Sequence, residues 1–527
     1  MKKLRFLINF NKKNRTLRYL VFFRVINSLL LSTLFEPDEF FQNIDIVYKI
    51  ILNNNHLTWD WVYGIRSFCF PLLYFLPAFV LKKIFIFIFK ENWKPKFVSC
   101  NFFVVKILNG IFSGLCDFCT IRIAENFKIN KYHTIFVTLT SHILYLYSAR
   151  SHVNSAEMWF SVFSIYFLIR YNKNKKISTL IFCYILITYS FYMRQSSCII
   201  IFPFFLQNIL SPTNFYLLTG KNGIFIKILI FLLVSLITLF SLIYIDTLLY
   251  CENIIPPLNF YIINVKHKIS EFFSHQDLMF YFSVFFVMTG LDSIYLIKKA
   301  DIFLKNVFYF LFRLRFRELK EYFKFIISLL DLEKQKLLFY FALPIMKYFI
   351  FYSTFKHKEM RFLLPIIPFF NILIAYNFKF DKLIIFKILI LIFSIYIGTK
   401  HQNYSTLKYL KSQKYDFRDI DFCVTSYCYP INMFTEHKTK QLSNNIDIKS
   451  FCLKRYIEFD DHSDYKTNLN DNFFMNCKKY LKKINNKYIL IEDRTLNEGF
   501  YILENKYKII NFFEYRYGIY HILLKKI

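Results

Sequence analysis

The sequence predicts an α-helical protein that crosses the membrane many times and carries a small α+β domain at its C-terminal end. Two observations support this fold class. Of the 527 residues, 55% are hydrophobic and 21% are aromatic, far more than a soluble protein of this size needs to fill its core. Long apolar runs recur up to about residue 400, whereas residues 401–527 are richer in Asn, Asp, Lys and Tyr.

The apolar runs predict the membrane spans. Because about 20 apolar residues cross a bilayer, we expect roughly 10 to 12 spans. The runs are 17–35, 68–89, 98–118, 134–149, 156–171, 178–194, 197–210, 224–250, 278–297, 337–355, 361–376 and 383–399. Lysines at 82–96 and in 170–176 both favour the cytosolic side. Three runs lie between them, and an odd number of spans would place the two groups on opposite sides of the membrane. One of these three is therefore expected to be broken, re-entrant or miscounted.

The two ends of the chain suggest a domain organisation. Residues 1–16 are basic and lack a small-residue cleavage site, which predicts a cytosolic tail on a retained signal anchor. The first span then leads to the lumen and to a polar luminal loop, 36–67, within a membrane region of 17–400. Apolar runs at 487–493 and 507–513 resemble strands, so the tail is expected to fold as a luminal α+β domain.

Charge and cysteine content exclude some functions. The net charge of +32 could indicate nucleic-acid binding, but the lysines lie in short loops between apolar runs, as the positive-inside rule describes. No nucleic-acid partner is predicted. Cys116 and Cys119 form an isolated CxxC, for which packing is the simpler role. Four cysteines of the tail could pair in three ways, and nothing in the sequence selects one: Cys423, Cys428, Cys452 and Cys477.

Polar clusters interrupt the apolar chain, and because ionisable groups at membrane depth are costly, each is a candidate functional site. They lie in the stretches LFEPDEFFQN, HLTWDWVYGIRSF, RSHVNSAE, YMRQSS and HKEMRFLLPIIP. The candidate residues in them are Asp38, Glu39, Gln42, Trp59, Asp60, Arg66, Arg150, Glu157, Arg194, His357, Lys358 and Arg361. Carboxylates, arginines and flat aromatic faces together suit a sugar-binding cavity, which leaves a transporter and a lipid-linked enzyme both open.

Each cluster also has a purely structural explanation. Arg194 could be a snorkelling arginine at the end of a span. Glu157 could pair with Arg150 and cap the helix that follows. Asp38 and Glu39 could occupy the first turn of a helix, where acids are favoured. HKEMR could be an ordinary charged loop, and the tryptophans could belong to an interfacial belt.

Six stretches of the chain, most of which contain these clusters, resemble the motifs of a known family and occur in the same order. EPDEFFQ resembles the signature PDE-x-x-Q, HLTWDW with IRSFCFPLLY resembles LTWEW and IRS, and RSHVNSAEM resembles R-x-x-x-N-x-x-E. MRQSS takes the place of RPT, PPLNFYIINV with FFSHQDLMFY resembles N-F-x-x-x-N and Y-G-x-H-P-W, and HKEMRFLLPIIP resembles HKE-x-R-F-x-x-P-x-x-P. These patterns resemble the mannosyltransferases of glycosyltransferase family 22, which have the GT-C fold. The resemblance covers about residues 17–376.

The resemblance implies a substrate class and a location. Family 22 enzymes work in the endoplasmic reticulum membrane with dolichyl-phosphate mannose as donor. LTWDW and TSYCYP (425–430) look most like members that add the third mannose, α-1,2-linked, of the glycosylphosphatidylinositol (GPI) precursor, the PIG-B type. Members that add the fourth GPI mannose or extend the dolichol-linked N-glycan are the alternatives. A transporter would be expected to show two related halves, and no such repeat is seen.

The resemblance also implies a mechanism. Transfer from a β-linked donor to an α-linked product inverts the anomeric carbon, and one carboxylate takes the proton of the acceptor hydroxyl. Asp38 matches the family's first-loop acid, and Glu39 or Gln42 would orient the acceptor. The leaving phosphate needs cations and hydrogen-bond donors, but no metal or cofactor. The candidates for contacting it are Arg194, His275, Lys358 and Arg361. The sequence departs from the family at Glu36, Gln195–Ser196 and Gln276–Asp277, where relatives carry His or Val, Pro-Thr and Pro-Trp.

Overall fold

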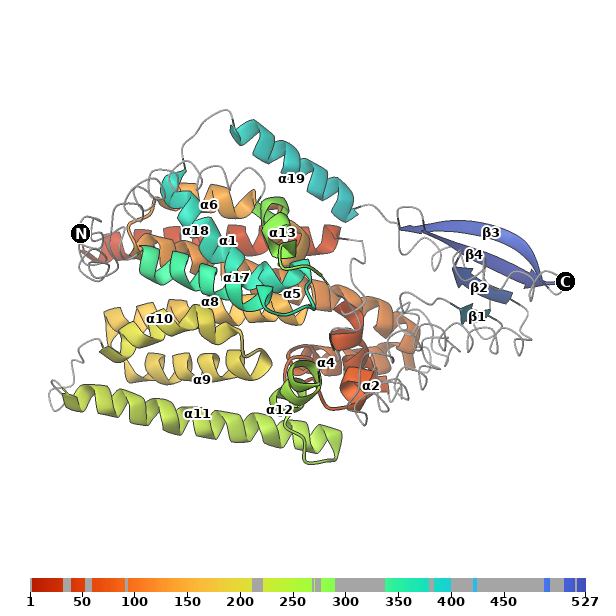
Figure 1. The fold of residues 1–527 in the computed structure, drawn as a ribbon, viewed down its shortest axis with the longest axis horizontal. Coiled ribbons are helices and arrows are strands. Elements are labelled where there is room, and N and C mark those ends of the chain that lie inside the picture. Colours follow the sequence, from red (N-terminus) through yellow and green to blue (C-terminus); the bar gives the residue numbers. More distant parts are fainter. Residues whose placement is uncertain are drawn as a thin grey trace, which may run out of the picture. The chain divides into compact units, whose positions relative to one another are not determined.

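The structure is a computed structural model of the chain. It describes residues 2–31, 39–52, 59–90, 93–210, 221–267, 270, 276–289, 337–378, 383–399, 420–423, 488–492, 507–516 and 519–527. Helices occupy almost all of the described residues up to 399, and strands occur only near the C-terminal end (Figure 1). The predicted helical class is thus confirmed.

The helical elements follow one another along the chain with few long interruptions. Those up to residue 210 are α1 (Lys2–Leu30), the π-helical turn η1 (Phe40–Ile44), α2 (Asp45–Leu52), α3 (Trp59–Val62), α4 (Leu72–Phe89), α5 (Trp93–Asn126), α6 (Lys131–Leu139), α7 (His142–Tyr147), α8 (Val153–Asn174), α9 (Ile177–Met193) and α10 (Ser197–Leu210). Those that follow are α11 (Lys221–Tyr250), α12 (Pro256–Phe260), η3 (Tyr261–Lys266), α13 (Phe280–Thr289), η5 (Leu338–Ala342), α17 (Leu343–Ser353), the 3-10 helix η6 (Met360–Ile366), α18 (Ile367–Asn377) and α19 (Leu383–Thr399).

Several of these helices match predicted membrane spans. Within the described residues, four helical segments are long and apolar enough to cross a bilayer: Leu72–Phe89, Cys100–Asn126, Gly223–Tyr250 and Met360–Asn377. Three shorter apolar helices, α9, α10 and α19, also fall on predicted runs. The chain is therefore a multi-pass membrane protein, and the total of roughly 10 to 12 spans stays a prediction.

The segment between α5 and α8 explains the odd number of runs in this region. The predicted run 134–149 is interrupted at Thr140 and Ser141, and the two helices on either side, α6 and α7, have nine and six residues. Neither is long enough to cross a bilayer, which needs about 20 residues. One of the three runs is thus broken, as the lysine distribution predicted.

By internal contacts, the chain divides into two units, and the first comprises residues 1–28, 108–245 and 274–396. Its central helix is α8, which packs against α9, α10 and η6 (Figure 1). Small polar side chains such as Ser155, Ser161 and Ser164 are completely buried in α8. Small residues let neighbouring helices approach closely inside a membrane, so these serines of α8 are buried where it packs against its neighbours.

In the same unit, α1 packs directly on α5 through two glycines. Gly110 and Gly114 are four residues apart, the spacing of a GxxxG motif. A Cβ added to Gly110 would lie 2.5 Å from the Cα of Val25, and one added to Gly114 would lie 2.5 Å from the Cα of Val21. Only glycine permits this distance between the two backbones.

The second unit comprises residues 29–107, 246–273 and 397–527. The predicted polar loop 36–67 falls in it, and most of its described part is helical, because η1, α2 and α3 occupy it; residues 63–67 form a turn. Val47 and Tyr48 of α2 are fully buried. An apolar helical face, which the loop prediction overlooked, therefore anchors this segment.

The C-terminal region contributes four strands to the second unit. They are β1 (Ile420–Cys423), β2 (Tyr488–Glu492), β3 (Tyr507–Arg516) and β4 (Ile519–Lys526), in the order β1-β2-β4-β3 (Figure 1). β1 and β2 pair in parallel, and the other pairs are antiparallel. The runs at 487–493 and 507–513 are thus strands. The described part of 401–527 holds no helix, so the α+β class and its luminal side stay predictions.

Candidate active site

The structure places most, but not all, of the predicted site residues. Asp38 and His275 lie outside the described residues, and only the backbone of Trp59 is described, in α3. Glu39 is half-buried just before η1, and Gln42 is buried within it. The remaining candidates form two groups in the first unit and one in the second, and each group is described by itself.

The first unit contains a fully buried carboxylate, Glu157, in the first turns of α8. Its Oε2 lies 3.3 Å from Nε of Arg194, the residue that ends α9. The Arg194 side chain is 13% exposed and also lies over the ring of Phe362, 5.2 Å from its centre. Two structural explanations from the sequence are therefore wrong: Glu157 pairs with Arg194 rather than Arg150, and Arg194 does not snorkel to a surface.

Hydroxyl groups close this ion pair into a ring of hydrogen bonds. Arg194 Nη2 donates to the Tyr352 hydroxyl at 3.4 Å, which donates to Ser196 Oγ at 2.9 Å. Ser196 in turn donates to Glu157 Oε1 at 2.5 Å. The Tyr348 hydroxyl lies 3.2 Å from the same carboxylate oxygen. We call these five residues the Glu157 network; it links α8, α9 and α17.

The Glu157 network contains three residues that the sequence did not single out. Tyr348 and Tyr352 stand four residues apart in α17, which places both hydroxyls on one helix face. Ser196 stands where family 22 relatives carry Thr, so a hydroxyl is kept at this position. The MRQSS stretch was thus the available signal for Ser196, whereas two tyrosines in a chain with 39 of them gave no signal.

The HKEMR stretch forms a second group in the first unit, centred on Glu359. One carboxylate oxygen lies 3.3 Å from His357 Nε2, and the other accepts a hydrogen bond from Arg361 Nε. Burial alone would raise the pKa of Glu359, but Arg361 and His357 together lower that pKa to about 2. Glu359 is therefore ionised at neutral pH and fixes Arg361.

A second family-like motif lies beside this stretch. Lys358 Nζ donates to the carbonyl of Gln276 at 3.0 Å, and the Gln276 N–H donates to the carbonyl of Lys356 at 3.0 Å. The backbone N–H of Glu359 donates to the Tyr281 hydroxyl at 3.2 Å. FFSHQDLMFY and HKEMRF, about 80 residues apart, are therefore held together by three hydrogen bonds.

The RSHVNSAE stretch completes the group. His152 is 1% exposed, and neither of its ring nitrogens has a hydrogen-bond partner among the described residues. Burial, with Arg361 and Arg150 nearby, keeps the pKa of His152 well below its usual value, although Glu359 acts in the opposite direction. Arg150, Arg361 and Glu359 are thus close enough to His152 to influence the charge of its ring. Arg150 is buried, and its Nε donates to the carbonyl of Leu146 at 2.6 Å.

In the second unit, Asp60 and Arg66 form an ion pair. Arg66 Nε lies 3.1 Å from Asp60 Oδ2, and the aspartate is 6% exposed. The neighbouring Trp61 is fully buried against Phe68, with Tyr250 stacked at 6.4 Å between ring centres. The side chains of HLTWDWVYGIRSF thus have different roles. Trp61 is a core residue, and Asp60 and Arg66 supply the charged groups.

The motif PPLNFYIINV meets this loop in the same unit. Asn259 donates to the carbonyl of Tyr63 at 3.2 Å, and the Tyr250 hydroxyl donates to the carbonyl of Arg66 at 2.7 Å. Gly64 has a φ of +62°, and a Cβ there would lie 2.7 Å from Ile254 Cγ2. A glycine is therefore needed at this turn both for its backbone conformation and for space.

The charges of the first unit suit an anionic ligand. Three cations of this group, Arg150, Lys358 and Arg361, stand against two carboxylates: Glu359, which holds Arg361, and Asp277, which acts on Lys358. Arg194 pairs with Glu157. Arginine binds phosphate oxygens with two parallel hydrogen bonds, and lysine as a point charge. The described residues contain no group of three or more His, Cys, Asp and Glu side chains that could hold a metal ion.

Most of the chain resembles known proteins. The model of the Alg9-like mannosyltransferase family matches residues 16–436. GPI mannosyltransferase 3 of Candida glabrata is 24% identical over 78% of this chain and 74% of its own length. GPI alpha-1,2-mannosyltransferase 3 of Xenopus laevis is 26% identical over 28% of this chain and 26% of its own length. The chain therefore spans about a quarter of the Xenopus relative in that alignment.

One solved structure is similar over nearly the whole chain. The crystal structure of ArnT from Cupriavidus metallidurans, bound to undecaprenyl phosphate, superposes with a TM-score of 0.54 and covers 97% of both chains. The sequences are only 9% identical. The likeness thus concerns the fold alone.

Proposed function

Because the chain belongs to the Alg9-like mannosyltransferase family, we propose that it transfers mannose from dolichyl-phosphate mannose to a GPI precursor. The product would carry the third mannose in α-1,2 linkage. The names of the Candida glabrata and Xenopus laevis relatives support this acceptor. The observation that carries the proposal is the convergence of RSHVNSAE, FFSHQDLMFY and HKEMRF on one buried, cationic group.

In this proposal, the cationic group of the first unit binds the phosphate of the donor. Arg150, Lys358 and Arg361 stabilise the negative charge that grows on the phosphate as it leaves. Glu359 holds Arg361 in one orientation through their hydrogen bond. Arg194 is a further candidate for contacting the phosphate, and Glu157, 3.3 Å from it, would hold it in one orientation.

The acceptor hydroxyl is deprotonated by Asp38 in this proposal. Transfer is a single displacement with inversion, and the phosphate leaves as an anion, so the chemistry requires one base and no strong acid. Glu39 and Gln42 assist from η1, and Asp60 with Arg66 contacts the sugar of the acceptor. These assignments come from the motif EPDEFFQ and from the charges of the first loop.

The proposed site faces the lumen of the endoplasmic reticulum. The basic residues 1–16 favour the cytosolic side, so a first span leading from them delivers the EPDEFFQ motif to the lumen. The C-terminal residues 401–527 would form a luminal domain of the GT-C enzyme.

Depletion of the protein from its native cells tests the acceptor. We expect a GPI precursor with two mannoses to accumulate, and expression of the intact chain to remove it. Accumulation of a three-mannose GPI precursor would instead identify the enzyme of the fourth mannose. An incomplete dolichol-linked oligosaccharide would identify an N-glycan enzyme, and unchanged pools of both glycans would contradict the mannosyltransferase proposal.

A further inference from the structure

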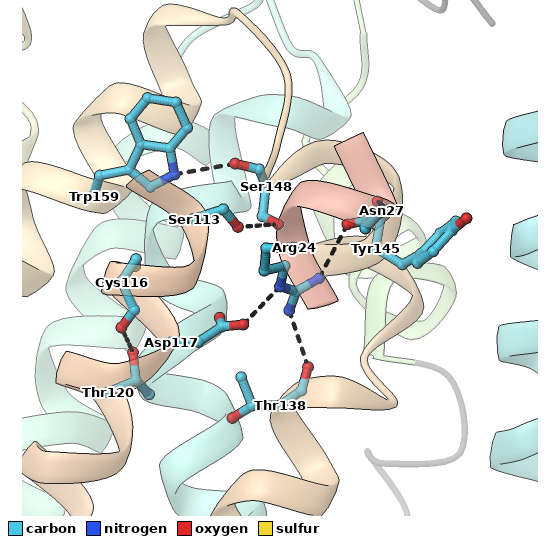
Figure 2. A network of polar contacts seen from close by, with 10 residues as sticks. All are labelled: Arg24, Asn27, Ser113, Cys116, Asp117, Thr120, Thr138, Tyr145, Ser148 and Trp159. Atoms are coloured by element: carbon cyan, nitrogen blue, oxygen red, sulfur yellow. Dashed lines mark hydrogen bonds and ion pairs between the residues drawn. The ribbon is translucent and has the colours of Figure 1, made fainter. Parts of the chain in front are cut away.

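The last two turns of α1 carry three buried polar side chains, Arg24, Asn27 and Ser28, which we call the α1 seam. Arg24 Nε donates to Asp117 Oδ2 of α5 at 2.6 Å, and Arg24 Nη1 lies 3.4 Å from Asn27 Oδ1 (Figure 2). Both charged side chains are almost completely buried. Burying two charged side chains inside a membrane protein costs free energy, so such a pair is expected to have a function.

The remaining hydrogen bonds of the α1 seam all go to backbone carbonyls of the broken segment between α5 and α8. Arg24 Nη2 donates to the carbonyl of Thr138 at 3.3 Å, and Asn27 Nδ2 to that of Tyr145 at 3.0 Å (Figure 2). Ser28 Oγ donates to the carbonyl of Ala149 at 3.1 Å. The last turns of helices leave carbonyls without helical partners, and the membrane offers no water to bind them.

The turn 148–151, which contains Ala149, is also held by side chains of α5 and α8. Ser113 Oγ of α5 donates to Ser148 Oγ at 2.7 Å, and Trp159 Nε1 of α8 donates to the Ser148 carbonyl at 3.0 Å (Figure 2). Asn109 Nδ2 of α5 donates to Ser151 Oγ at 2.8 Å. The turn 148–151 is thus fixed by α1, α5 and α8 together, directly before the N-terminus of α8.

We propose that the α1 seam is a positioning device for the active site. By holding the carbonyl of Ala149, it sets the backbone of the adjacent Arg150 and the start of α8, which carries Glu157. Ser28 is therefore a positioning residue for the proposed phosphate-binding group, although it belongs to the first span and carries no charge. This inference rests on the proposed mannosyl transfer.

The closing experiment compares two serine variants in the full-length protein, purified in detergent with dolichyl-phosphate mannose and a two-mannose GPI acceptor. Ser28→Ala removes the hydrogen bond to the Ala149 carbonyl. Ser164→Ala is the matched control, because Ser164 is also fully buried but its Oγ donates to Phe160 of its own helix, at 2.7 Å. Both variants lose one hydroxyl, and only the first releases the turn.

We expect Ser28→Ala to lower kcat/KM about tenfold with a Tm equal to that of Ser164→Ala, whose kcat/KM stays within about twofold of the intact protein. Equal kcat/KM values for the two variants would overturn the inference. An inactive intact protein would contradict the proposed function instead.

A double variant provides an independent test. Replacing both members of a buried ion pair by apolar residues commonly restores stability, so Arg24→Met with Asp117→Leu is expected to fold. The variant still lacks the donor to the Thr138 carbonyl, and we expect its kcat/KM to stay about tenfold below that of the intact protein at a similar Tm. Full recovery of kcat/KM would show that the pair only stabilises the fold, and would overturn the inference.

Discussion

Arg194 Nε and Glu157 Oε2 lie 3.3 Å apart, which joins the end of α9 to the first turns of α8. The two residues fall in separate sequence motifs and were expected to contact substrate independently. Their pairing shows that the two motifs meet in the folded chain and fixes the orientation of the guanidinium.

Removing one member of this pair should destabilise the protein strongly. Glu157→Leu leaves the buried Arg194 without a counter-ion, and we expect a loss of about 3 to 5 kcal/mol in unfolding free energy. Thermal unfolding in detergent measures the change. The control is Arg122→Met, which breaks a pair with Glu125 whose side chains are 24% and 27% exposed. It should cost about 0 to 1 kcal/mol; equal losses for both variants would contradict the assigned role.

Glu359 should make stability depend on pH in the acid range. Its pKa is lowered from 4.5 to about 2, so the ionised form is favoured in the folded protein. The resulting stabilisation is complete above the unfolded value and is lost as pH falls from about 4.5 to 2. The Tm difference between the intact protein and Glu359→Gln should therefore be constant above pH 5 and shrink below it. A difference that grows on acidification would refute this assignment.

Two adjacent lysines in the apolar helix α4 should behave differently. Lys82 Nζ donates to the carbonyl of Ile51 in the last turn of α2, at 2.8 Å, whereas Lys83 lies over the ring of Phe79. Methionine suits an apolar helix better than lysine does. Lys82→Met nevertheless removes the hydrogen bond that the charged amine donates to the carbonyl at the end of α2. We expect Lys82→Met to cost about 1.5 to 3 kcal/mol in unfolding free energy and Lys83→Met almost nothing. Indistinguishable Tm values would disprove the anchoring of α2 by Lys82.

Asp38 is expected to be the catalytic base. Asp38→Asn keeps the size and polarity of the side chain but cannot accept the proton of the acceptor hydroxyl. Mannosyl transfer should be abolished, while the amount of protein in the membrane stays normal. The assay uses the purified variant, with Glu39→Gln as the comparison, for which we expect a partial loss. Near-normal transfer by Asp38→Asn would exclude it as the base.

Composition was sufficient to predict the membrane class and several spans, because the hydrophobic effect of the bilayer acts on every residue of a run. The break between α6 and α7 was predicted only indirectly, from lysines on either side, since Thr140 and Ser141 interrupt an otherwise apolar run without a proline or glycine. A helix beginning at Asp38–Glu39 was one of the two explanations that the sequence offered for these acids, and the described residues from Glu39 to Leu52 are helical. The loop interpretation failed because one face of this segment is apolar and buried.

The sequence singled out side chains whose charge is rare in an apolar segment. Glu157 and Arg194 were found because ionisable residues in apolar runs are costly, but their pairing depends on how α8 and α9 pack. Tyr348 could not be found, since aromatic side chains occur throughout the chain and only tertiary structure brings this hydroxyl to a carboxylate. Arg24 was not singled out either, because its partner Asp117 lies 93 residues away and only the packing of α1 on α5 brings the two together.

The α1 seam also constrains how the protein is made. The carbonyls of Thr138 and Tyr145 are bound by side chains synthesised more than a hundred residues earlier. Because α1 is synthesised first, we expect it to enter the bilayer before α6 and α7 and to offer hydrogen-bond donors to the carbonyls at their ends.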